Sequence, residues 1–165
     1  MPQTIDDIKA KARQIWAEII PSGDATALPD VMHPDCADHS ARPGEPPGIE
    51  GLTQTMRWLH SVFADLAFDI HHVIGEGDTV AVHCTLTGRH TGDLMGIPPT
   101  GRPVATPMVH ILRFRDGKAS EHWAVHDDMT TMRQLGVLPA RPPHSGTMQF
   151  RGFPGDKLWP FRLVS

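Results

Sequence analysis

The residues best suited to chemistry lie between His110 and Gly136, in the segment HILRFRDGKASEHWAVHDDMTTMRQLG. It combines histidines, a tryptophan and the carboxylate of Asp127, which follows an otherwise apolar run. A carboxylate moved from water to an apolar wall has its charged form disfavoured, so its pKa rises from about 4 toward the range where it can take and return a proton. We therefore predict that Asp127 is a proton-transfer base, and that Asp127→Asn abolishes turnover.

The turn Asp116-Gly117 lies between two alternating runs and predicts a tight two-residue hairpin. Side chains alternate along a strand, so the pairing that starts from this turn places one set of residues on a single face. That set includes Met108, His110, Trp123, Val125 and Asp127. The pairing places His122 and His126 on the opposite face. A one-residue bulge in the turn would change the partners but leave the alternation within each strand unchanged.

A structural role competes with the chemical one for Asp127. The residues Met129 to Leu135 are expected to form a helix that Gly136 ends, and an aspartate just before a helix is a common N-cap. Asp128 is the better placed cap because it lies one residue nearer the helix. The capping role of Asp127 stays open beside its role as a base.

Length and composition bound the class of protein. A chain of 165 residues is sufficient for one domain with a single core. A net charge of -4 offers no basic surface for nucleic acid or an anionic membrane. No apolar run is long enough to span a membrane, and the acidic, helical N-terminal segment is unlike a signal peptide, so we expect a cytoplasmic protein. The absence of tyrosine excludes a tyrosine acid, and Cys36 and Cys84 are expected to remain thiols.

The order of elements predicts an α+β fold. Apolar spacing predicts helices at about 5–20, 25–31 and 52–63, with a brief strand near 33–40. Alternating runs at 68–74 and 79–88 form a second hairpin before the loop 91–102. Helices followed by antiparallel strands indicate a curved sheet that closes over helices, a domain spanning 1–137. Residues 138–165 are interpreted as a Pro-rich C-terminal extension whose aromatic residues could dock on the domain or on a second subunit.

The segments TGRHTGDLMGIPPTGR and RFRDGKASEHW, followed by Asp127 and a helix ending in QLG, together resemble the SnoaL-like polyketide cyclase family, also called ester cyclases. The resemblance covers about residues 5–137. It implies the nuclear transport factor 2-like cone, a strongly curved antiparallel sheet packed against N-terminal helices around an apolar pocket. It also implies homodimers or homotetramers and no cofactor. Asp127 matches the family's catalytic acid/base, and His39, His90 and His110 look like its pocket histidines, while the extension has no counterpart.

The activity implied by this resemblance is an intramolecular aldol-type ring closure of a hydrophobic carbonyl or ester substrate. Asp127 would remove a proton from carbon and later return it, and His110 would polarise a carbonyl. In a cone whose concave side is the pocket, Met108 and Trp123 would line the substrate site as well as the core. The histidines match no closed metal-ligand motif, so no metal is expected.

Two alternatives stay open at this point. One is a hydrolase or isomerase of the epoxide-opening type in the same pocket, which needs a second acidic group near Asp127. The other is a non-catalytic domain that binds a small hydrophobic molecule, in which Asp127 would have an ordinary pKa.

Overall fold

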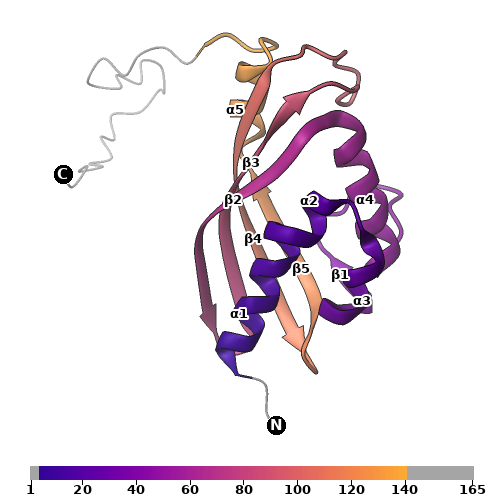
Figure 1. Cartoon of the computed structure of the whole chain (residues 1–165), viewed down its shortest axis with the longest axis vertical. Coiled ribbons are helices and arrows are strands. Elements are labelled where there is room, and N and C mark those ends of the chain that lie inside the picture. Colours follow the sequence, from indigo (N-terminus) through magenta and orange to yellow (C-terminus); the bar gives the residue numbers. More distant parts are fainter. Residues whose placement is uncertain (1–3, 141–165) are drawn as a thin grey trace, which may run out of the picture.

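Helices of the N-terminal half cover one face of a five-stranded sheet (Figure 1). The computed structural model describes residues 4–140, so the predicted extension lies outside the described residues from residue 141 onward. Helix α1 (Ile5–Gln14) starts at Thr4, whose side chain and that of Asp7 form a capping box. The chain continues through a π-helical turn (Ile15–Ile19) into α2 (Ile20–Ser22). The π turn ends two residues before Pro21, which has no N–H to donate to the preceding turn.

A short connecting region brings the chain to the first strand. It consists of a 3₁₀ turn (Ala25–Ala27) and α3 (Leu28–Val31), and strand β1 (Met32–Asp38) follows at once. Helix α4 (Gly48–Val62) then packs against β1. Gly48 has φ +67°, and a Cβ there would lie 1.8 Å from the Pro34 carbonyl oxygen. The glycine therefore allows α4 to begin in contact with the backbone of β1.

The other strands form the bulk of the sheet. They are β2 (Phe63–Glu76), β3 (Thr79–His90), β4 (Pro103–Arg115) and β5 (Lys118–His126), and α5 (Asp128–Gln134) follows. The strand order is β1-β5-β4-β3-β2, with β1 parallel to β5 and the remaining pairs antiparallel. The predicted α+β class is confirmed, but the expectation of an entirely antiparallel sheet is wrong for β1.

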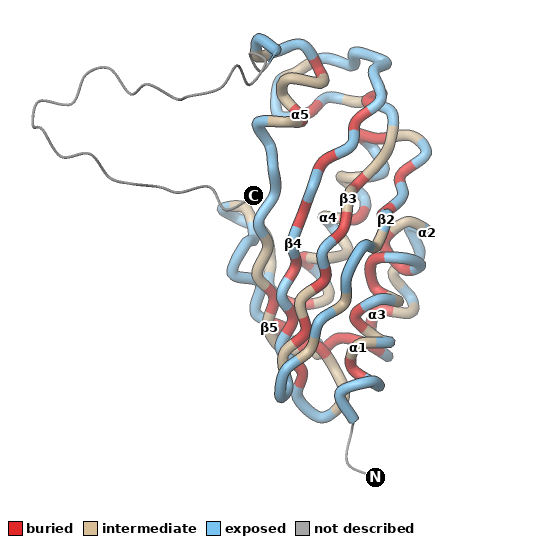
Figure 2. The backbone as a smooth tube through the Cα atoms, turned by 90° about the vertical axis from the view of Figure 1, so that its left-hand side faces the viewer, coloured by how far each residue is buried: buried red, intermediate tan, exposed pale blue. Residues whose placement is uncertain are grey.

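The two faces of the sheet differ in burial (Figure 2). Residues of β4 alternate strictly between exposed and buried from Pro103 to Arg115. We call the face toward the helices the inner face and the opposite one the outer face. The core lies between the inner face and the helices, and it includes Trp16, Leu28, Met56, Val82 and Leu112. Among residues 4–140, no helix has the length and apolar character needed to cross a membrane.

A bulge in β5 changes the predicted register of the last hairpin. Phe114 pairs with Ala119, but the next residue of β4, Arg113, pairs with Glu121, so Ser120 is an extra residue. From there on, the residues of β5 are shifted by one relative to the predicted pairing. His110 therefore pairs with Ala124 instead of Trp123.

Candidate active site

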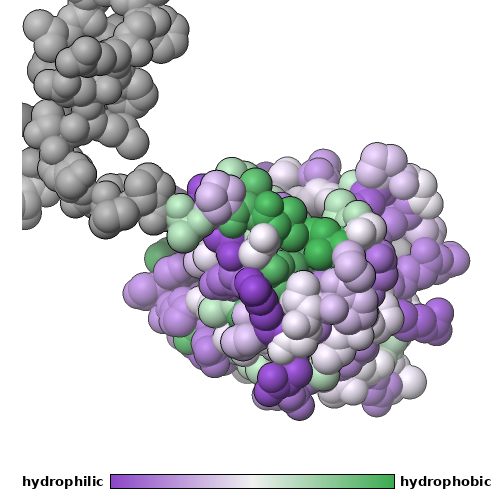
Figure 3. Space-filling model, turned by 90° about the horizontal axis from the view of Figure 1, so that it is seen from above, coloured by the Kyte–Doolittle hydropathy of each residue, from purple (hydrophilic) through white to green (hydrophobic). Residues whose placement is uncertain are grey.

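A cavity of about 400 Å³ lies between the inner face of the sheet and the helices. Its lining is mainly apolar and includes Ile20, Leu52, Leu59, Phe63, Phe68 and Leu86. The loop 91–102 contributes Leu94 and Met95, and α5 contributes Met132. Viewed from above, hydrophobic residues gather on the surface of the molecule (Figure 3). The exposed side chains of Met95 and Met129 belong to this loop and to α5.

Three polar side chains in the cavity wall form a hydrogen-bonded row, which we call the Asp-His-His triad. Its members are Asp38, His122 and His110. Asp38 Oδ1 lies 3.0 Å from His122 Nδ1, and His122 Nε2 lies 3.1 Å from His110 Nδ1. The parallel pairing of β1 with β5 places Asp38 beside His122, and the antiparallel pairing of β4 with β5 brings His110 close.

Burial determines the properties of His110. Its side chain is only 3% exposed and stacks on Trp16, with ring centroids 3.5 Å apart and an interplanar angle of 21°. Desolvation holds the pKa of His110 well below its ordinary value, and the neighbouring His122 and His126 lower it further. Its Nε2 is buried and has no hydrogen-bond partner among the described residues. A neutral imidazole with one unpaired nitrogen can act as a base or as a hydrogen-bond donor, depending on its tautomer.

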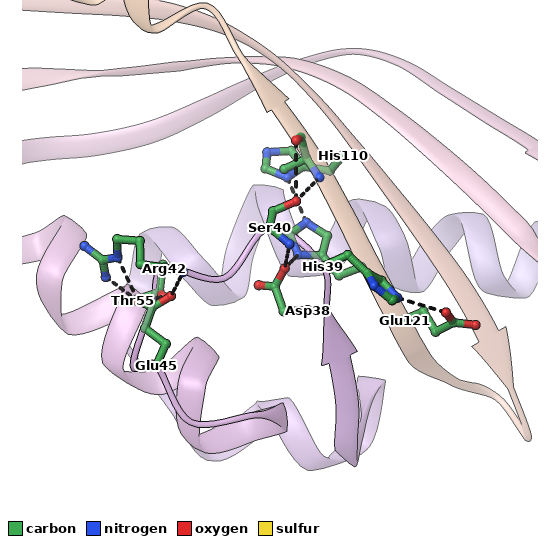
Figure 4. Close-up of polar contacts among 10 residues, drawn as sticks. Asp38, His39, Ser40, Arg42, Glu45, Thr55, His110 and Glu121 are labelled. Atoms are coloured by element: carbon green, nitrogen blue, oxygen red, sulfur yellow. Dashed lines mark hydrogen bonds and ion pairs between the residues drawn. The ribbon is translucent and has the colours of Figure 1, made fainter.

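Asp38 supplies negative charge at the other end of the triad. Burial pushes the pKa of its carboxyl group upward, but hydrogen bonds from His122 and from the Ser40 backbone outweigh this effect and hold it below the ordinary value. The Ser40 N–H donates to Asp38 Oδ1 at 2.8 Å. Figure 4 shows Asp38 and Ser40 close to His110, at the point where the chain leaves β1. Asp38 is therefore ionised at neutral pH.

The loop after β1 and helix α4 add a second cluster of polar side chains to the lining. Glu45 accepts hydrogen bonds from the backbone and guanidinium of Arg42 and, at 3.1 Å, from Thr55 (Figure 4). The guanidinium also lies 4.1 Å from the centroid of the Trp58 ring. These bonds from Arg42 and Thr55 lower the pKa of Glu45 against the opposing effect of burial. The positive charge of Arg42 is thus already matched by a carboxylate of the protein.

Asp127 does not occupy the predicted position. It is exposed, it does not line the cavity, and its carboxylate caps α5 by accepting from Thr130 N at 3.0 Å and Thr130 Oγ1 at 2.7 Å. The prediction of a dry environment for Asp127 is therefore wrong, and so is the preference for Asp128 as the cap. The helix backbone donates to Asp127 because this residue is the last before α5.

His39 and Trp123 also lie outside the cavity. Their rings stack on each other with centroids 4.6 Å apart, and His39 Nε2 lies 3.0 Å from Glu121 (Figure 4). The bulge at Ser120 places Trp123 opposite Ile111 on the outer face. Neither residue is among those that line the cavity, so the expected pocket positions of both are wrong.

Of the two other predicted pocket residues, Met108 lines the cavity and His90 does not. His90 is completely buried, but it is not part of the cavity lining. Its Nδ1 accepts from the Thr100 N–H at 3.2 Å, which ties β3 to the loop 91–102. Met108 lies on the inner face and lines the cavity beside His110, so the predicted position of this residue is confirmed.

The sequence interpretation missed several cavity residues. Asp38 had a weak signal, because the two-residue spacing from the buried Cys36 places both on one side of a strand. His122, His126 and Ala124 gave no such signal, because the bulge reverses their predicted side. Asp128 lines the cavity from the start of α5. Among residues 4–140, no group of three or more histidine, cysteine or acidic side chains is arranged to hold a metal ion.

A mainly apolar cavity with a hydrogen-bonded polar triad in its wall is typical of enzymes that act on small hydrophobic molecules. The family model for SnoaL-like polyketide cyclase matches residues 10–135. The chain is 32% identical over 109 residues to nogalonic acid methyl ester cyclase of Streptomyces nogalater, covering 66% of this chain and 78% of the relative. An aklanonic acid methyl ester cyclase of Streptomyces peucetius is also 32% identical over 109 residues, with 65% and 72% covered.

Solved structures agree with this relationship. TsrD from Streptomyces laurentii superposes with a TM-score of 0.76 at 28% identity, covering 82% of this chain and 99% of TsrD. IdmH from Streptomyces antibioticus superposes with a TM-score of 0.69 at 33% identity, covering 79% and 99%. The chain belongs to the SnoaL-like polyketide cyclase family, and it is an enzyme of the polyketide cyclase type.

Proposed function

We propose that this enzyme closes a ring in a neutral polyketide ester by an intramolecular aldol-type reaction that needs no cofactor. The observation that carries this proposal is the Asp-His-His triad in the wall of an otherwise apolar cavity. The apolar walls suit a hydrophobic substrate, and they include His110, whose Nε2 has no hydrogen-bond partner among the described residues. The relatives' names, methyl ester cyclases of nogalonic and aklanonic acid, support an ester of this kind.

In the proposed reaction, His110 is the general acid/base. Its Nε2 takes a proton from a carbon flanked by carbonyl groups, and the electron pair of the broken C–H bond forms an enolate. The enolate carbon attacks a ketone of the same molecule, which forms the new C–C bond and leaves an alkoxide. The proton held by the triad then returns to this alkoxide, so the enzyme is restored and the product is an isomer of the substrate. The neighbouring carbonyls delocalise the enolate charge, and the cavity holds the two carbons close together.

The charges in the wall support a neutral ester over a free acid. Among the described residues, three carboxylates line the cavity, namely Asp38, Glu45 and Asp128. The guanidinium of Arg42 is already bonded to Glu45. A substrate carboxylate would therefore meet like charges, and within residues 4–140 the cavity lining offers it no unpaired arginine or lysine, so this juxtaposition is unfavourable. Methylation of the substrate acid removes the conflict.

The test uses aklanonic acid methyl ester and nogalonic acid methyl ester, each beside its free acid. We expect a chromatographic shift without a mass change for at least one ester, with kcat/KM at least about tenfold higher than for the acid. His110→Gln keeps a group that can hydrogen-bond to His122 but cannot act as a base, so kcat should fall by roughly 10²-fold to 10⁴-fold. In D₂O the wild type should exchange the acidic C–H hydrogen of the ester faster than H110Q. Tight ester binding with neither exchange nor ring closure would favour a binding protein instead.

We also propose that a second copy of the chain packs on the outer face of the sheet. This face exposes apolar side chains next to one another on paired strands, and Val109, Ile111 and Val125 are among them. Contiguous exposed apolar surface commonly marks a protein interface. Analytical ultracentrifugation should give a dimer or tetramer for the wild type, and Ile111→Lys should shift it toward the monomer. A monomeric wild type at micromolar concentration would refute this assembly.

A further inference from the structure

The hydrogen bonds of the triad determine which ring nitrogen of His110 carries the hydrogen. We propose that Asp38 and His122 hold His110 in the tautomer with hydrogen on Nδ1, so that Nε2 carries a lone pair. When Nε2 takes up a proton, the hydrogen on Nδ1 passes to His122, and His110 stays neutral. This inference rests on the proposed function, because it assigns positioning roles to two residues around the proposed base. Asp38 and His122 act through His110 and need not contact the substrate.

The argument starts at the carboxylate. An ionised carboxylate can only accept hydrogen bonds, so His122 Nδ1, 3.0 Å from Asp38 Oδ1, must carry a hydrogen. When His122 is neutral, its Nε2 is then bare and can only accept. His110 Nδ1 lies 3.1 Å from that nitrogen, so His110 must donate from Nδ1. The single hydrogen of a neutral His110 is thereby used, and Nε2 carries a lone pair.

The surroundings of His110 favour this arrangement. The Trp16 ring stacked on the imidazole restricts its rotation, so exchanging the two ring nitrogens by a flip would disrupt this contact. Among the described residues, His126 is another titratable group in ring contact with His110, with centroids 5.6 Å apart and no hydrogen bond between the rings. The other charged groups that line the cavity are Asp128, Glu45 and Arg42. None of these three is hydrogen-bonded to the triad, so Asp38 is the group that sets its tautomer.

The same row explains how a deeply buried histidine can receive a proton. When Nε2 takes a proton from carbon, His110 would hold a positive charge in a site that strongly disfavours it. Transfer of the Nδ1 hydrogen to His122 Nε2 leaves His110 neutral and moves the charge to His122, next to the Asp38 carboxylate. The reverse transfer returns the hydrogen when Nε2 gives its proton to the alkoxide. No atom or electron is gained or lost by the protein over the cycle.

Nitrogen-15 NMR of histidine-labelled protein tests the tautomer without any substrate. Above the pH at which the triad takes up a proton, we expect His110 Nε2 to resonate as a bare nitrogen and Nδ1 as a protonated one. Asp38→Asn presents an amide that can donate to His122 Nδ1, which would reverse the hydrogens along the row and place one on His110 Nε2. Asp35→Asn is the matched control, because Asp35 is an exposed carboxylate of the same strand outside the cavity. A wild type with protonated His110 Nε2 at that pH would overturn the proposal.

Kinetics add a second readout. In D38N and in His122→Gln, kcat should fall roughly 10²-fold to 10⁴-fold with KM changed less than about threefold, and D35N should match the wild type. Unchanged kcat in D38N would overturn the positioning role. The two proposals fail separately, because the NMR result stands even if no tested ester is cyclised. Conversely, the predicted tautomer together with full activity of H110Q would refute His110 as the base while leaving the hydrogen-bond assignment intact.

Discussion

The two faces of the β4–β5 hairpin carry similar residue types in opposite environments. On the inner face, His110 and His122 share a hydrogen bond and His110 stacks on Trp16, away from solvent. On the outer face, His39 stacks on Trp123, while Glu121 bonds to His39 at 3.0 Å and to Arg113 at 2.7 Å. A histidine stacked on an aromatic ring thus forms a candidate site only where the surrounding structure removes water from both rings.

Electrostatics differ between the faces for the same reason. The hydrogen bond from His39 is the main cause that lowers the pKa of Glu121. Burial is the main cause that lowers the pKa of His110. Exposed pairs are screened by water and contribute little, whereas a buried imidazole has its protonation state set by its neighbours. The inner face is therefore the place where proton chemistry can be tuned.

Deletion of Ser120 should have the largest effect, because it would exchange the residues that β5 places on the two faces. Without this extra residue, the residues of β5 after it would change sides, so that Trp123 would face the helices and His122 the solvent. We expect kcat/KM for a methyl ester substrate to fall by at least roughly 10³-fold, because the triad is lost. Ser120→Ala keeps the residue count and should retain most activity. A deletion variant that is as active as the wild type would show that the register does not define the site.

Truncating a side chain of β4 should lower the free energy of unfolding more on the inner face than on the outer face. Leu112 is 1% exposed on the inner face, and Ile111 is 38% exposed on the outer face. We expect Leu112→Ala to lower the free energy of unfolding by about 2 to 5 kcal/mol, and Ile111→Ala by less than about 1.5 kcal/mol. Urea denaturation below the concentration at which copies associate measures both values. Equal losses would mean that the outer face is buried as deeply as the inner one.

Lowering the pH should remove stabilisation of the fold from both faces, but the size of this loss should depend on salt differently on each face. Asp38 and Glu121 both have lowered pKa values in the folded protein. Each stabilises the fold fully above the unfolded pKa, about 4, and this stabilisation is lost as pH falls through the folded pKa. The partners of Glu121, His39 and Arg113, are 43% and 48% exposed, whereas His122, the partner of Asp38, is 11% exposed, so added salt should reduce the contribution of Glu121 more than that of Asp38. Thermal unfolding of D38N and Glu121→Gln between about pH 2 and pH 5, with and without salt, measures this. Identical salt effects would contradict the assigned environments.

Asp127→Asn is expected to have the smallest effect. Asparagine caps helices as well as aspartate does, so α5 should be preserved. Because Asp127 is exposed and does not line the cavity, kcat should stay within about threefold of the wild type. Asp127→Ala should cost about 1 kcal/mol in stability through loss of the cap. A loss of activity above about 100-fold in D127N would reinstate Asp127 as the base.

Much of the fold could be predicted because it depends on local patterns. The spacing of Ile8, Ala12, Ile15 and Ile19 predicts the first helix, and the turn Asp116-Gly117 predicts the last hairpin. Gly136, with φ +81°, follows α5 as expected for a residue that ends a helix. In the candidate site, the positions of Met108 and His110 were predicted correctly, because they lie on β4, whose alternation is unbroken.

The sequence by itself determined the class of elements, their order and the side of β4 that is buried, because periodicity and turn residues act within a few positions of the chain. Only the tertiary structure decided which carboxylate meets which histidine. The bulge at Ser120 moved His122 to the inner face, and the parallel pairing of β1 with β5 brought Asp38, from a distant part of the chain, to 3.0 Å from it. Such a contact depends on register and strand order, which are set by packing across the whole sheet and leave no local pattern to detect.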